Sequence, residues 1–116
     1  MVYAHLITLR SLLERAASTH DRGIAIECMH FFSGAAAYAN GRIFMTLTTV
    51  GLALKLPRES QEILIGQGAK TLRYFPTGPI KKDYVVLPDQ IAKDPGALAP
   101  WIAKSVLFSQ ISPKAQ

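Results

Sequence analysis

The sequence predicts an α+β domain, in which an antiparallel sheet of about five to six strands packs against a helix at each end of the chain. Two observations predict this class. Between residues 24 and 87, short runs alternate apolar residues with polar or small ones, which is the period of a half-buried strand. Before and after these runs, apolar residues recur at helical spacing. The length of 116 residues fits one domain, residues 1–116, with a core over about residues 22–110.

Local signals predict the elements of the first half. Apolar residues recur at helical spacing over about residues 2–18 and predict a first helix. The pair Asn40-Gly41 tolerates positive φ angles, so it predicts the two-residue turn of a hairpin. Pro57 ends the fourth strand, because proline has no amide hydrogen to donate. The expected strands begin near Ile24 and then cover residues 35–39, 42–47 and 52–56.

The second half is expected to add a short helix and a second hairpin. Good helix formers over residues 58–65 predict the helix. Two further strands are expected at residues 71–75 and 83–87, joined by the turn-forming run from Pro76 to Pro79.

The last element is predicted to be a helix that packs on the sheet. Asp94 can cap the free amides of a helix start, and Pro95 suits the first helical position. Because proline is poorly tolerated inside a helix, the helix should either kink at Pro100 or restart with Pro100 in its own first turn, and we expect the restart. The tail, residues 112–116, is expected to fray. The residues expected to face the sheet are Leu98, Trp101, Ile102, Ser105 and Val106.

Composition narrows the class of protein. Hydrophobic residues make up 49% of the chain and charged residues 18%, a balance typical of a compact fold. The longest uncharged stretch, residues 43–54, is too short for a membrane-spanning helix, and the amino terminus lacks the features of a secretory signal. The single cysteine, Cys28, has no partner for an internal disulfide, which agrees with a reducing compartment. We therefore expect a cytoplasmic protein without a membrane contact.

The basic residues suggest one candidate contact for a polyanion. The formal net charge is +5, which favours nucleic acid or another polyanion at low salt. A solvated surface is the more common explanation for such charges and is the one favoured here. Nearby aromatic residues could instead stack on single-stranded bases, although no motif of an RNA-binding module accompanies them. The dense basic group consists of Lys70, Arg73, Lys81 and Lys82.

Two patterns resemble catalytic or metal-binding motifs but depart from them in spacing. Ala69 separates Gly68 from Lys70, so the run does not match a phosphate-binding loop. Cys28 and His30 fall on one side of a predicted strand, but a metal site needs a third ligand. Packing in the sheet is the expected role of this pair.

Two more patterns are explained better by a structural role than by catalysis. Ser33 before Gly34 lacks the flanking glycine of a nucleophile elbow, so both residues are assigned to a turn, as are Asn40 and Gly41. Glu59 and Glu62 share a face of a short helix and are expected to be solvated. No catalytic residue, cofactor or metal is therefore expected. The expected core anchors are Phe32, Phe44 and Trp101.

Taken as an ordered series, the motifs resemble the amino-terminal domain family of the TfoX/Sxy competence regulators. The resemblance extends over about residues 29–108. Ser33 stands where the family usually has glycine. The motifs that carry the resemblance are Phe31-Phe32-Ser33-Gly34, Asn40-Gly41 with Phe44, the run from Gly51 to Leu56, the run from Pro79 to Val85, and Asp94-Pro95 followed by Trp101.

The resemblance implies a curved antiparallel sheet with packed helices, found in bacterial regulators of natural transformation, with no established reaction. Full-length regulators of this kind carry a second, helical domain, so the chain is expected to be a stand-alone form. We expect a non-enzymatic regulatory or protein-interaction module with an unknown protein partner. A weak nucleic-acid binder that uses Lys70–Lys82 is the alternative, and a small enzyme is the third. We also expect a symmetric homodimer, formed through a sheet edge or the apolar surface of a helix.

Overall fold

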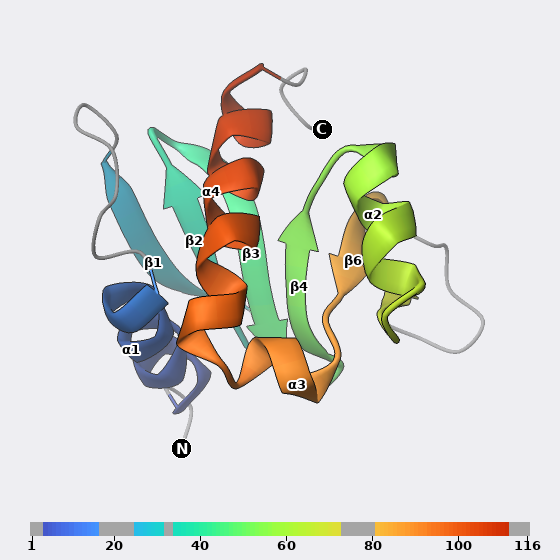
Figure 1. Cartoon of the computed structure of the whole chain (residues 1–116). Helices are drawn as coiled ribbons and strands as arrows, with labels where there is room; N and C mark the ends of the chain where they lie inside the picture. The colour runs from blue at the N-terminus through green and yellow to red at the C-terminus, as the bar shows by residue number, and fades with distance from the viewer. Residues whose placement is uncertain (1–3, 17–24, 32–33, 73–80, 112–116) are drawn as a thin grey trace.

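The computed structural model describes residues 4–16, 25–31, 34–72 and 81–111. These residues form one six-stranded antiparallel sheet with helices on one side of it, which confirms the predicted α+β class (Figure 1). The elements in chain order are α1 (Ala4–Ala16), β1 (Ile26–Phe31), β2 (Gly34–Ala39), β3 (Arg42–Thr48), β4 (Gly51–Lys55), α2 (Arg58–Ile65), β5 (Lys70–Leu72), β6 (Lys81–Val86), α3 (Asp89–Ala92) and α4 (Pro95–Ile111).

The strand order of the sheet is β1-β2-β3-β4-β6-β5. Strands β1 to β4 follow one another as successive hairpins, whereas β6 returns to pair with β4 and leaves β5 at the edge. Between β2 and β3, Asn40 and Gly41 have φ angles of 51° and 82°. These are the positive values that a two-residue hairpin turn requires, and Asn and Gly adopt them most readily.

The core lies between the sheet and its helices. Leu9 of α1 and Leu98 of α4 are fully buried, and α1 and α4 both contact β2 and β3. Phe44 of β3 is the largest fully buried side chain and belongs to the same cluster. Burial of large apolar side chains of this kind contributes about 1.5–3 kcal/mol each, so α1 and α4 are held mainly by their inner faces.

Gly34, the first residue of β2, is required by a close approach of two strands. A Cβ atom added there would lie 2.4 Å from the carbonyl oxygen of Leu47 and 2.7 Å from Cγ2 of Thr48. Real Cβ atoms do not come this close to a backbone oxygen, so a larger residue would push β2 and β3 apart.

The expected restart of the last helix at Pro100 is wrong, because α4 is continuous from Pro95 to Ile111. Asp94 supplies a single start: its Oδ1 accepts hydrogen bonds from the amides of Gly96 at 3.0 Å and Ala97 at 3.4 Å. Pro100 removes only the amide that would have bonded to the Gly96 carbonyl, and Gly96 is exposed to water. The capped start and the packed inner face outweigh this loss.

The second half differs from expectation in two further ways. The four-residue helix α3 was not predicted, although Pro88 and Asp89 stand at its start. Strands β5 and β6 begin one and two residues earlier than expected, at Lys70 and Lys81. The expected turn from Pro76 to Pro79 lies outside the described residues.

A serine of α4 joins two strands where their ladder ends. The paired residues of β3 and β4 stop at Met45 and Leu54. Phe44 and Lys55 would come next, but their carbonyl oxygens both lie beside the Ser105 hydroxyl, at 2.8 Å and 2.7 Å from its Oγ. Ser105 is fully buried. Its hydroxyl therefore satisfies backbone acceptors that water does not reach.

Candidate protein-interaction surface

The solvent-facing side of α4 is an exposed surface that carries a single charged residue. Six exposed residues of α4 recur at intervals of one to four positions, so they form one stripe along the helix. Leu107 and Ile111 are 57% and 80% exposed. The outer face of α4 consists of Gly96, Pro100, Ala103, Lys104, Leu107 and Ile111.

An ordinary surface helix carries polar and charged residues on its outer side. In α2 the exposed residues include the charged Arg58, Glu59 and Glu62, although Ile63 and Ile65 are also 54% and 44% exposed. In α4, Lys104 is the one charged residue among all 17 positions, and the inner face is apolar as well. A helix that is apolar on both sides is usually covered on both sides, whereas among the described residues only the inner side of α4 is covered.

The helix α4 stands in front of the sheet in Figure 1, with α1 on one side and α2 on the other. Its inner face packs on β2, β3 and β4, and it also contacts α1 and α3. Gln110, in the last turn, donates from Nε2 to the Ala39 carbonyl at 2.7 Å and so ties the end of α4 to β2. The outer face is therefore presented on a rigid element, which suits recognition of a partner.

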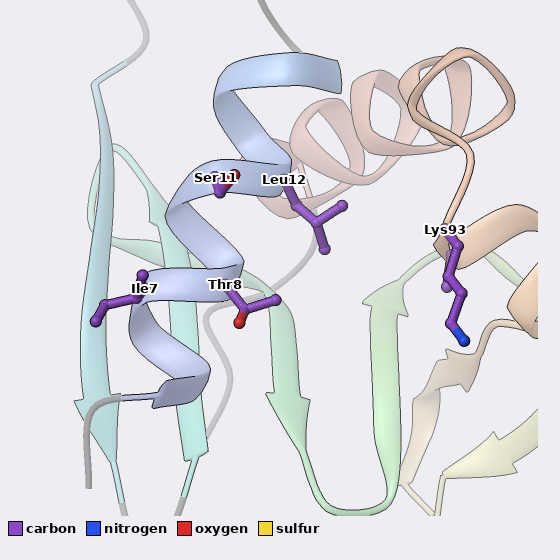
Figure 2. Close-up of a pocket in the computed structure, with 6 residues that line it drawn as sticks. Ile7, Thr8, Ser11, Leu12 and Lys93 are labelled. Carbon is purple, nitrogen blue, oxygen red and sulfur yellow. The ribbon is translucent and has the colours of Figure 1, made fainter. Parts of the chain in front are cut away.

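A shallow groove lies between α1 and the end of α3, with a volume of about 480 Å³. Thr8 and Leu12 point from α1 toward the side where Lys93 lies (Figure 2). Lys93 pairs with Asp89 at 3.8 Å, but both side chains are more than three-quarters exposed, so the pair stabilises little. The described lining residues supply hydroxyls, apolar surface and one ammonium group, and none of them has a carboxylate, imidazole or thiol that could act as a general base.

The basic group is only partly described. Lys70 of β5 and Lys82 of β6 are both exposed on neighbouring strands. Arg73 lies outside the described residues, and only the backbone of Lys81 is described. The structure thus places two of the four cations on one edge region of the sheet.

The residue pairs that resemble catalytic or metal-binding motifs in the sequence lie on two separate elements, β1 and α2. Cys28 and His30 are half-buried on β1, whereas Glu59 and Glu62 are exposed on α2. Among the described residues, no three His, Cys, Asp or Glu side chains come together as a metal would need.

The structure also locates the residues that the sequence predicted to be core anchors or turn residues. Phe44 is fully buried, and Trp101 is half-buried and packs against the core cluster from α4. Phe32 and Ser33 lie outside the described residues. Asn40 also anchors β1, because its Oδ1 accepts from the amide of Ala25 at 2.9 Å.

Sequence reasoning missed the outer face of α4, because only the inner residues of the helix were assigned a role. A signal was present, since a 17-residue helix with one charge is rare on a protein surface.

Among the described helices, none has the length and apolar character needed to cross a membrane.

Comparison with known proteins identifies one family. A model of the TfoX N-terminal domain matches residues 22–109 of the chain. The match runs from before β1 nearly to the end of α4, so it includes all of the outer face except Ile111. Among curated proteins, no sequence matches the chain at a significant level.

Proposed function

The chain belongs to the TfoX N-terminal domain family, and we propose that it is a non-enzymatic regulatory module that binds another protein chain through the outer face of α4. Family membership supports a regulatory or competence-related role. The outer face supports the mode of action, because an exposed apolar stripe on a rigid helix is the usual form of a helix-mediated protein contact.

Burial of this face supplies part of the driving force for association. Leu107 and Ile111 are 57% and 80% exposed, and fully burying a side chain of this size contributes about 1.5–3 kcal/mol. Covering both side chains then contributes roughly 2–4 kcal/mol, before Pro100 and Ala103 are counted. Only one charge, that of Lys104, has to stay in contact with water.

Site-specific crosslinking in the source cells tests this proposal. A photoreactive amino acid at Ala103 should form adducts with a protein, and the same amino acid at Glu62 of α2 should not. Leu107→Glu should abolish the Ala103 adducts and the regulated output of the cell, such as transformation frequency, because a carboxylate in an apolar contact is costly. Adducts that form equally from Ala103 and Glu62, or that survive Leu107→Glu, would contradict the proposal.

Nucleic-acid binding is the second candidate, and the exposure of Lys70 and Lys82 on adjacent strands favours it. Fluorescence anisotropy with duplex DNA should then show an affinity that falls steeply as salt rises. The double variant Lys70→Gln/Lys82→Gln should weaken binding, whereas Lys93→Gln, which removes a cation elsewhere, should not. Equal losses in the two variants would indicate attraction by net charge alone.

A further inference from the structure

We propose that the partner of the α4 outer face is a second copy of this chain, and that the two copies of α4 pair antiparallel across a two-fold axis. The inference rests on the proposed function, because both use the outer face of α4. It adds an identified partner and a defined register, which are read from the distribution of large and small residues along the stripe.

The two halves of the stripe differ in size. The first half presents Gly96, Pro100 and Ala103, which have small or compact side chains. The second half presents Leu107 and Ile111, which project furthest into solvent. One half therefore provides shallow positions and the other half provides the side chains to fill them, which is the complementarity that packed helices require.

An antiparallel pair brings these halves together. If the axis passes between Ala103 and Lys104, Gly96 lies opposite the partner's Ile111 and Pro100 lies opposite the partner's Leu107. Both contacts then join a large residue to a small one, and symmetry forms each of them twice. A parallel pair would instead place Ile111 against Ile111 and Gly96 against Gly96, leaving a clash at one end and a gap at the other.

The charge on the stripe gives this dimer an electrostatic signature. The proposed axis brings Lys104 of each copy close to Lys104 of the other, and no described acidic residue lies on the outer face of α4. The two ammonium groups repel each other, and salt screens that repulsion. Dimerisation should therefore become stronger as salt rises, which is opposite to the salt dependence of nucleic-acid binding.

The size of the contact sets the expected affinity. A helix of 17 residues is about 25 Å long. One pair of such helices is small beside the roughly 800 Å² per partner of a standard interface. We therefore expect a weak, reversible dimer that dissociates on dilution, with a dissociation constant on the order of 0.1 mM.

Sedimentation or light scattering on the purified chain, diluted from about 1 mM to 1 μM, tests the proposal. The mass should fall from twice 12.7 kDa toward 12.7 kDa within this range. Gly96→Leu should raise the dissociation constant by about tenfold or more, because two large residues then meet at each end. The monomer has room for this change, since a Cβ at Gly96 meets only the Asp94 carboxylate, at 3.5 Å.

A compensating variant separates pairing from mere disturbance of the helix. Adding Ile111→Ala to Gly96→Leu again places a large residue against a small one and should return the dissociation constant to within about threefold of the original. Lys104→Gln should strengthen the dimer and remove its salt dependence. The melting temperature of each variant, measured on the monomer, shows that it is folded.

The following results would contradict the dimer or its register. A mass of 12.7 kDa at every concentration overturns the dimer. A dimer that ignores Gly96→Leu, or that is not restored by the compensating change, overturns this register. If the chain stays monomeric while Ala103 crosslinks to a different protein in cells, the dimer is wrong and the proposed function stands.

Discussion

Replacing Ser105 with alanine should destabilise the fold by much more than the loss of one oxygen atom suggests. The Ser105 hydroxyl lies 2.8 Å from the Phe44 carbonyl oxygen and 2.7 Å from the Lys55 carbonyl oxygen, and Ser105 is fully buried. One hydroxyl proton serves both acceptors. Without it, two strand carbonyls remain in the interior with no water to replace the lost donor.

The magnitude follows from the cost of an unsatisfied buried acceptor. Such a group costs about 1–3 kcal/mol, and the methyl group of alanine leaves little extra cavity. We therefore expect Ser105→Ala to lower the free energy of unfolding by about 1–3 kcal/mol. In a domain of this size, that loss lowers Tm by at least about 4 °C.

Ser109 provides a matched control on the same helix. It is 1% exposed, and its hydroxyl donates to the Val106 carbonyl at 2.6 Å and accepts from Gln110 Nε2 at 3.0 Å, so both hydrogen bonds stay within α4. That carbonyl lies at the position that normally accepts the helical amide of Gln110, so Ser109→Ala should cost less than about 1 kcal/mol. Both variants remove one buried hydroxyl, but only Ser105 joins two strands.

Urea unfolding, followed by far-ultraviolet circular dichroism and by Trp101 fluorescence, measures the difference. Ser105→Ala should lower the midpoint at an unchanged m value, and Ser109→Ala should hardly move it. Equal shifts in the two variants, or an unchanged midpoint for Ser105→Ala, would refute the assignment of Ser105 as the link between β3 and β4.

Four further substitutions, of which Gly66→Ala is a control, should have effects of differing sign that thermal unfolding can measure. Gly34→Ala should lower stability by about 1–3 kcal/mol through its clash with β3, whereas Gly66→Ala, with its nearest contact at 3.4 Å, should be neutral or stabilising; similar effects would contradict the close approach. Gly41→Val should cost about 1–3 kcal/mol through backbone strain alone, because nothing lies within 4 Å of an added Cβ, and an unchanged Tm would exclude a positive φ there. Pro100→Ala should raise Tm, because it restores the amide donor for the Gly96 carbonyl; a lower Tm would mean that α4 needs the proline to fit the sheet.

The hairpins of the sheet could be predicted because their signals are local. Asn40 and Gly41 specify a turn by their own φ preferences, and the flanking alternation specifies which sides are buried. The course of α4 could not be predicted in this way. At Pro100 the local preference opposes the helix, and the contacts that outweigh it come from strands far away in the sequence.

Burial also departs from what residue type predicts. Lys55 is charged but only 4% exposed, whereas Leu107 is apolar and 57% exposed. Periodicity identifies two sides of a helix or strand, but it does not say which of them meets solvent. The sequence therefore marks α4 as unusually apolar but does not show which side is the outer face, because α4 has no polar side.

The place of β6 between β4 and β5 constrains the order in which the molecule can fold. Strands β1 to β4 join through short local connections, so this meander can form early and quickly. The chain runs through α2 and β5 before it reaches β6, so β6 can pair with β4 only later. Helix α4 follows β6 in the chain. Until α4 docks, an early meander would leave Phe44 and its apolar neighbours open to other chains. Aggregation during refolding should therefore depend on how fast the last helix arrives, more than on how fast the first strands pair.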